Sequence, residues 1–97
     1  MKPSETIKNV IENSSTKFKY QLLSRLKMDC DYYLGYGNRN KKILWSGSEE
    51  QHIADMKALY ESFKESEKPE WLTIEDIKEY ENKMCENYWK NGSFRYF

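Results

Sequence analysis

Apolar residues recur at intervals of three and four along most of this chain, the spacing that places them on one face of an α-helix. The longest such stripe predicts a central core helix over residues 16–34, and two further stripes predict helices over 48–64 and 73–90. Residues 42–45 are the only weak candidate for a strand. We therefore predict an all-α fold, a small bundle of three main helices plus a short N-terminal helix.

Capping signals indicate where the helices begin. Ser48 is followed three residues later by a glutamine, and Thr73 is followed three residues later by Asp76, both in the form of a capping box. Ser4 precedes a short apolar stripe that is marginal by itself, so the N-terminal helix should either dock on the bundle or fray. Residues 13–16 offer several competing caps, and fusion of the first two helices into one long helix stays open.

The second and third helices are joined by a connector, residues 33–47, that holds three of the four glycines. Gly35 and Gly37 flank an aromatic residue and are followed by Asn-Arg-Asn, residue types that accept positive φ or bond their own backbone. Regular helix should stop here, with Gly35 in the position of a C-terminal helix cap. The apolar residues that follow should fold back as an anchor, and we expect Trp45 and Trp71 to be substantially buried.

The size and charge of the chain are consistent with a single domain, residues 1–97. A length of 97 residues allows one modest core, and an aromatic content of 15% argues against disorder throughout. The formal net charge is zero, but residues 1–47 carry nine Lys or Arg against four Asp or Glu, and residues 48–97 carry seven against twelve. This asymmetry is modest for nucleic-acid binding. It fits oppositely biased faces that help helices pack or chains form a homodimer.

Neither a membrane segment nor a secretion signal is predicted. No run of about 18 apolar residues is present, and residues 1–5 lack the apolar core of a signal peptide. We therefore expect a cytoplasmic protein without membrane contact. Cys30 and Cys85 lack the spacing of redox or metal motifs, and in a reducing compartment we expect both to be buried core thiols.

The residues needed for catalysis or for cofactor binding are few. His52, the one histidine, has no indicated nucleophile or orienting partner, and we expect it to be a surface or cap-region side chain. One histidine and two distant cysteines do not match the spacing of a metal site. Residues 35–38 lack the later glycine and the lysine-hydroxyl pair of a phosphate-binding loop. We predict a protein that is not an enzyme and uses no cofactor or metal.

The candidate binding residues lie mainly in the connector. Its basic and aromatic side chains can tie the helices together, can contact a protein, or can contact nucleic-acid phosphates and bases, and all three interpretations stay open. The acids that open the third helix can complement the helix dipole or face a basic partner. The predicted partner-binding residues are Tyr36, Asn38, Arg39, Lys41, Lys42, Glu49 and Glu50.

Several segments, in a fixed order over about residues 20–84, resemble a known family. They are Leu22 to Lys27, the acidic-aromatic turn 29–34, Gly37-Asn38-Arg39-Asn40, Leu44-Trp45-Ser46-Gly47 and Lys68-Pro69-Glu70-Trp71-Leu72-Thr73. Together they look like a large polyvalent protein-associated domain of the small class with a YLG-GNR-LW-G core and a KPEWLT segment. An N-terminal extension, 1–19, and an aromatic tail, 91–97, lie outside the resemblance. The matched positions are Tyr33, Gly35, Gly37, Asn38, Arg39, Trp45, Pro69 and Trp71.

The resemblance implies a product of phages or conjugative elements that acts inside a bacterial host cell. A common task of such products is to disarm CRISPR or restriction defences, so the resemblance implies a stoichiometric inhibitor of a host defence nuclease complex, an anti-CRISPR or antirestriction protein. The alternative is a small nucleic-acid-binding accessory factor that uses the basic first half, although direct nucleic-acid binding is less favoured. No catalytic residue is implied, and the tail, too aromatic for a solvated terminus, is expected to pack on the bundle or on a partner.

Overall fold

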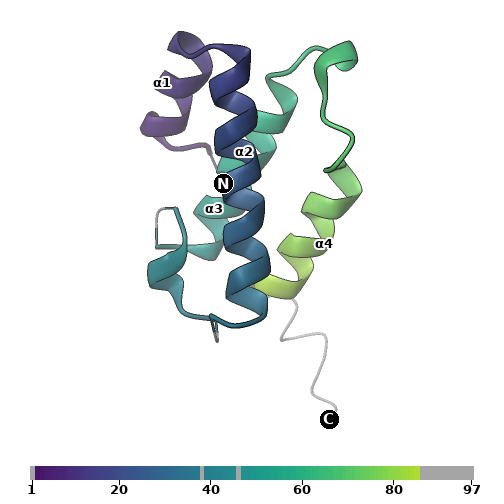
Figure 1. The fold of residues 1–97 in the computed structure, drawn as a ribbon. Coiled ribbons are helices and arrows are strands. Elements are labelled where there is room, and N and C mark those ends of the chain that lie inside the picture. Colours follow the sequence, from purple (N-terminus) through teal and green to yellow (C-terminus); the bar gives the residue numbers. More distant parts are fainter. Residues whose placement is uncertain (1, 38, 46, 86–97) are drawn as a thin grey trace.

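A computed structural model describes residues 2–37, 39–45 and 47–85, and all regular structure within those ranges is helical. Two short 3₁₀ turns lie in the connections between the α-helices. The predicted all-α fold and the order of its helices are confirmed (Figure 1). The elements are α1 (Glu5–Asn13), α2 (Thr16–Leu34), η1 (Lys41–Ile43), α3 (Glu49–Glu61), η2 (Glu65–Glu67) and α4 (Ile74–Met84).

Each α-helix begins at a hydroxyl side chain that accepts a backbone hydrogen bond. Ser4, Ser15, Ser48 and Thr73 each accept the N–H of the residue three positions later, one of the first-turn groups that have no partner within the helix. The capping box at Thr73 is complete, because Asp76 accepts the Thr73 N–H at 3.0 Å. The backbone just before Ser15 is extended, so α1 and α2 are separate helices.

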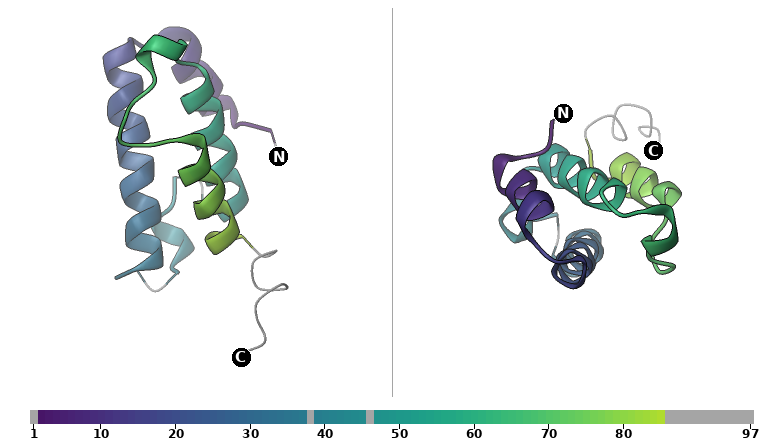
Figure 2. Two further views of the ribbon diagram at one scale, coloured as in Figure 1. Left: turned by 90° about the vertical axis from the view of Figure 1, so that its right-hand side faces the viewer. Right: turned by 90° about the horizontal axis from the view of Figure 1, so that it is seen from above.

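The helix at the centre of the bundle is α3, which contacts α1, α2 and α4. The end-on view in Figure 2 shows α1 and α4 on opposite sides of α3 and α2 across one face of it. The sequence had suggested α2 for the central place because its apolar stripe is the longest. In the structure α2 packs mainly on α3, α4 and η1, and its side chains Phe18, Met28 and Tyr32 are exposed.

The hydrophobic core contains side chains from all four α-helices. Leu23 and Leu26 of α2 and Met56 of α3 are fully buried, and Ile7 of α1 is buried with them. Complete burial of one such side chain contributes about 1.5–3 kcal/mol, so α1 docks on the bundle instead of fraying. The prediction of two buried thiols is also confirmed, because Cys30 and Cys85 are 0% and 8% exposed and both are free.

The prediction that both tryptophans are buried is wrong. Trp45 and Trp71 are 36% and 44% exposed, whereas the neighbouring Leu44 and Leu72 are 5% and 0% exposed. Successive side chains of extended backbone point to opposite sides, and Leu44 has extended backbone angles. Each leucine fills the core position, and the adjacent tryptophan is turned outward.

His52 is a second correction, because it is a fully buried residue and not a surface or cap-region one. Its Nδ1 accepts the Trp45 N–H at 3.1 Å, and its Nε2 lies 2.9 Å from the Leu26 carbonyl oxygen. A neutral ring protonated on Nε2 satisfies both contacts, and burial lowers the pKa of His52. The ring therefore ties α2, the connector and α3 together through backbone groups.

A buried carboxylate, Asp55, ties α1 to α3. Its Oδ1 accepts the Ser4 N–H at 2.8 Å, and its Oδ2 accepts the Ser4 hydroxyl at 2.9 Å. Gln51 donates to Asp55 Oδ1 at 3.0 Å and to the Lys2 carbonyl at 2.9 Å, so its side chain does not complete a box with Ser48. The carboxylate lies at the N-terminus of α1, where the helix dipole favours negative charge.

Two helices end earlier than predicted. The predicted helix over 48–64 ends at Glu61, where the Ser62 hydroxyl donates to the Leu59 carbonyl at 2.6 Å and takes up a C-terminal acceptor. The helix predicted to reach residue 90 ends at Met84, because the backbone of Cys85 is extended. Residues 86–90 and the predicted aromatic tail, 91–97, lie outside the described residues.

Candidate interaction surfaces

The foot of the bundle holds a polar cluster formed by the connector and the ends of α2 and α3. The Tyr33 hydroxyl donates to Glu49 Oε2 at 2.5 Å, and Lys41 Nζ lies 3.7 Å from Glu49 Oε1. The Arg39 guanidinium lies over the Tyr33 ring, 5.8 Å from its centroid. Burial and the hydrogen bond to Glu49 raise the pKa of Tyr33 to about 12. Arg39 and Glu49, both predicted to bind a partner, thus contact the protein itself.

The backbone of the connector explains one of its glycines. A Cβ at Gly37 would lie 2.8 Å from Ile43 Cδ1 and 2.9 Å from the Tyr32 carbonyl oxygen, too close for any other residue. The Gly37 N–H donates to that same carbonyl at 2.6 Å. The left-handed backbone near the end of α2 occurs at Arg39, with φ of 60°, whereas Gly35 has φ of −102°.

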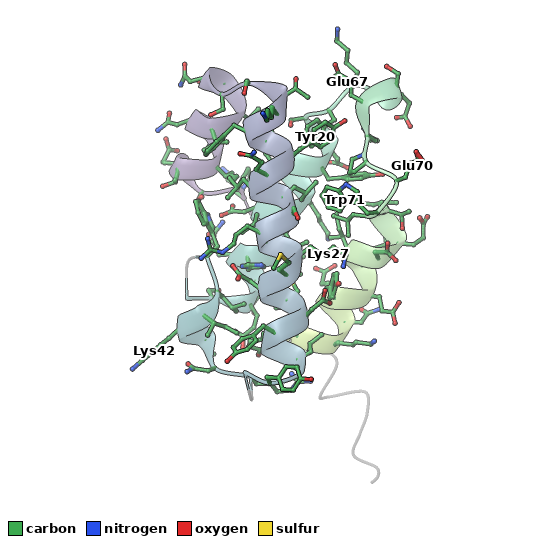
Figure 3. The ribbon with its side chains drawn as sticks, in the orientation of Figure 1. Tyr20, Lys27, Lys42, Glu67, Glu70 and Trp71 are labelled. Atoms are coloured by element: carbon green, nitrogen blue, oxygen red, sulfur yellow. The ribbon has the colours of Figure 1, made fainter. Side chains whose placement is uncertain are left out.

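Four of the other predicted binding residues are exposed to solvent, but they do not form one surface. Tyr36, at 92% exposed, belongs to the connector together with Lys41 and Lys42, and Figure 3 shows Lys42 pointing away from the bundle. Glu50 instead borders a small hollow between α3 and α4. Asn38 lies outside the described residues.

An exposed row of large side chains runs along α2. Phe18, Met28 and Tyr32 are 46%, 63% and 50% exposed, and the Tyr32 ring lies 6.4 Å from that of Tyr36 beyond the helix end. Aromatic residues, Met and Arg are enriched at protein interfaces relative to other surfaces, so this composition is typical of a protein-binding face. We call it the α2 outer stripe: Phe18, Gln21, Arg25, Met28, Tyr32 and Tyr36.

An open groove of about 620 Å³ lies between α2 and α4. Its first wall is the α2 face at Lys27, Asp31 and Leu34, and its second wall is α4. Trp71, from the segment before α4, lies in the groove, and Figure 3 shows Trp71 and Lys27 between the two helices. We call this the α2–α4 groove, lined by Lys27, Asp31, Leu34, Gly35, Trp71, Asp76, Glu79, Tyr80 and Lys83.

A hydrogen bond joins the two walls of the groove, and an ion pair lies along each wall. The Tyr80 hydroxyl donates to Asp31 Oδ1 at 2.5 Å, a contact between α4 and α2, and burial together with this bond raises the pKa of Tyr80. Lys27 lies 3.1 Å from Asp31 Oδ2, and Lys83 lies 3.0 Å from a Glu79 oxygen. With three carboxylates and two lysines, the groove carries a net charge of −1.

The two cysteines of the described residues are buried side chains of the core. Burial raises the pKa of Cys30, and burial followed by nearby Glu50 raises that of Cys85 to about 11, so both thiols stay protonated. No group of three potential ligands gathers to hold a metal within the described residues. Among the described helices, none combines the length and apolarity needed to cross a bilayer.

A family model matches residues 16–84, from the first residue of α2 to the last residue of α4. The chain belongs to the large polyvalent protein-associated domain 11 family. This confirms the resemblance found in the sequence and associates the protein with phages and mobile elements. No curated protein and no solved structure matches the chain.

Four of the eight positions that match the family in the sequence lie at two places in the structure. Tyr33 and Arg39 belong to the polar cluster at the foot of the bundle. Gly35 and Trp71, which are far apart in the sequence, both line the α2–α4 groove. Gly37 is explained by close packing. Trp71 is not explained by core packing, because Leu72 fills the core position next to it. The exposed tryptophan therefore makes the groove a candidate binding site.

Sequence analysis missed both the α2 outer stripe and the α2–α4 groove. The stripe had a signal, because positions 18, 21, 25, 28 and 32 are spaced alternately by three and four. That signal lies in the same helix as the stronger aliphatic stripe, and only the aliphatic stripe supports the sequence prediction of a core helix. The groove had no local signal, because it depends on how α4 is placed against α2.

Proposed function

We propose that this domain 11 protein is a non-catalytic interaction module that inhibits a host defence nuclease, of a CRISPR or restriction system, by stoichiometric binding. The observation that carries the proposal is the α2 outer stripe, where Phe18, Met28 and Tyr32 are each about half exposed. Such side chains contribute most to binding when a partner removes them from water. Family membership supports the mobile-element setting.

The dimensions of the stripe suit a protein partner. From Phe18 to Tyr32 it extends over about 21 Å at 1.5 Å per residue, a length compatible with a standard interface of about 800 Å² per partner. Its exposed centre at Met28 is flanked by aromatic side chains and by Arg25, which lies 3.6 Å from Asp29. Met, Arg and aromatic side chains are the types enriched at such interfaces.

The chemistry of the described residues supports binding over catalysis. The neutral ring of His52 has both nitrogens occupied by backbone groups, and the two thiols are buried. The acidic second half of the chain complements the basic channel with which a nuclease holds nucleic acid. Complementary charge speeds encounter more than it adds affinity.

A nucleic-acid-binding factor is the competing function, and exposed Tyr36, Lys41 and Lys42 favour it. Against it, Lys41 lies beside Glu49 and the Arg39 guanidinium lies over Tyr33, so part of the basic charge serves the fold. Binding of nucleic acid would weaken steeply as salt rises because counterions are released. An inhibitor of a nuclease should bind free DNA or RNA weakly at any salt concentration.

The test is a plasmid-interference assay in cells with an active CRISPR or restriction system, joined to pull-down from the same cells with and without nuclease digestion. The double variant Met28→Glu, Tyr32→Glu places charge at the centre of the α2 outer stripe. Asn82→Glu, on exposed α4, is the matched control. Circular dichroism verifies that each variant is folded.

We expect the wild type and Asn82→Glu to protect the targeted plasmid and to recover a defence protein after nuclease digestion, and we expect the stripe variant to do neither. Equal protection by the folded stripe variant would remove the stripe from the proposal. Recovery of nucleic acid alone, with salt-sensitive binding and no protection, would replace the inhibitor by the nucleic-acid-binding factor.

A further inference from the structure

We infer that the α2–α4 groove binds an arginine-bearing segment of a polypeptide, with the guanidinium group against Trp71 and among the groove carboxylates. The groove lies on a different face of α2 from the outer stripe: Lys27, Asp31 and Leu34 line it, whereas Arg25, Met28 and Tyr32 form the stripe. The inference goes beyond the proposed function and does not rest on it.

The aromatic part of the site is Trp71, which is 44% exposed, while the adjacent Leu72 is the residue buried in the core. Tyr80 and Leu34 line the same groove, and the Tyr80 hydroxyl is held by Asp31 at 2.5 Å. A tryptophan face attracts a cation more strongly than other rings do, and arginine is the cation most often found on it. An open groove with an exposed indole therefore suits a flat cationic side chain.

The charge of the groove also favours a cation. Each lysine already has a carboxylate within 3.1 Å, Lys27 with Asp31 and Lys83 with Glu79. Asp76 adds a further negative charge, and its Oδ2 accepts the Thr73 N–H of the capping box. An anionic ligand such as a phosphate would meet three carboxylates here. A guanidinium meets acceptors that match its fork of donors.

Arginine fits these features better than lysine does. Its guanidinium is planar, stacks on aromatic faces and bonds a carboxylate through two donors, whereas an ammonium group is a compact and strongly hydrated point charge. The volume of about 620 Å³ lies within the range of small-ligand sites, so a short peptide segment can enter beside the side chain. The occupant is thus a short basic segment of a partner polypeptide.

The probe is an acetylated and amidated Gly-Leu-Arg-Leu-Gly peptide, titrated into the ¹⁵N-labelled full chain and followed by NMR at the Trp71 indole N–H. The Trp71→Phe variant assigns that resonance. The same peptide with citrulline in place of arginine keeps the shape and removes the charge, and the lysine peptide keeps the charge and removes the plane. We expect saturable shifts with arginine, and affinity lower by about tenfold or more with citrulline, as expected for loss of a charge-assisted bond.

Two exposed residues allow opposite changes in affinity. Glu79→Gln removes a groove acceptor and should weaken binding of the arginine peptide, whereas Lys83→Gln releases Glu79 from its ion pair and should strengthen it. Glu70→Gln makes the same charge change next to Trp71 in sequence but outside the groove lining, and should leave affinity unchanged.

Equal affinity for the arginine and citrulline peptides would overturn the inference and make the groove an apolar site. So would the absence of saturation at millimolar peptide, or a Lys83→Gln variant that binds more weakly than the wild type. Because these measurements use the purified chain and a peptide, they stand apart from any result of the plasmid-interference assay.

Discussion

Replacement of Asp55 by asparagine should release α1 from the bundle. The Asp55 carboxylate accepts the Ser4 N–H at 2.8 Å, the Ser4 hydroxyl at 2.9 Å and the Gln51 side chain at 3.0 Å. Hydrogen bonds to a charged group contribute about 1.5–3 kcal/mol each, and asparagine keeps one acceptor while it turns an NH₂ group toward donors. We expect the free energy of unfolding to fall by about 2–4 kcal/mol, a large share of the 5–15 kcal/mol typical of small domains.

The loss should be concentrated in α1. A helix of nine residues is not stable alone in water, and α1 is held by Asp55 and by the burial of Ile7 in the core. Asparagine keeps only one acceptor oxygen, so at least one of the two Ser4 donors loses its partner. The amides of α1 should therefore exchange with solvent well before those of α2, α3 and α4.

Hydrogen exchange on the wild type and on Asp55→Asn measures this local opening, and urea unfolding measures the total. Glu61→Gln is the matched control, because it removes one negative charge from the exposed side of the same helix. Ser4→Ala should give a smaller loss of about 1–2 kcal/mol, as expected for a helix cap. Unchanged exchange in α1, with Asp55→Asn as stable as Glu61→Gln, would refute the proposed role of the carboxylate.

Three further predictions concern other buried or half-buried groups. Burial lowers the pKa of His52 in the folded state, so the unfolded chain takes up the proton first as pH falls below about 6.5. The free energy of unfolding should then fall by up to about 1.4 kcal/mol per pH unit. In urea unfolding, the free energy of His52→Gln should depend less steeply on pH than that of the wild type. Trp71→Ala should destabilise by about 1–2 kcal/mol, less than Leu72→Ala at about 2–5 kcal/mol, because Trp71 is half exposed and Leu72 is fully buried; thermal unfolding of both variants tests the order. Cys30 and Cys85, protonated and buried, should react with a thiol reagent only after urea unfolds the chain, so rapid labelling of the native protein would contradict their burial.

The helices could be predicted because their signals are local. A hydroxyl at the N-cap bonds a group three residues away, so Ser4, Ser48 and Thr73 act within one turn and can be recognised without knowledge of the rest of the fold. The exposure of Trp45 and Trp71 could not be predicted in this way. Size and hydrophobicity rank tryptophan above leucine, but which neighbour enters the core depends on the direction of the backbone as it reaches the bundle.

The candidate sites were harder to predict than the fold, for the same physical reason. Arg39 and Glu49 have residue types suited to a partner, yet both lie against Tyr33. Tyr33 lies in the last turn of α2, whereas Glu49 begins α3. His52 likewise has backbone partners, which no pattern of side chains in a sequence can show. Exposed positions such as Tyr36 and Lys42 could be identified, because a glycine-rich connector places its polar residues in solvent.

The width of the α2–α4 groove depends on a hydrogen bond between α4 and α2, which no local sequence pattern predicts. α4 packs on α3, where the Lys57–Glu81 ion pair spans 2.8 Å, and its Ile77 and Met84 are buried in the core that α2 and α3 share. Across the groove, the Tyr80 hydroxyl bonds Asp31 at 2.5 Å and limits how far the walls can separate. A ligand that entered between the walls would therefore act on this bond first, because α4 packs more extensively on α3 than on α2.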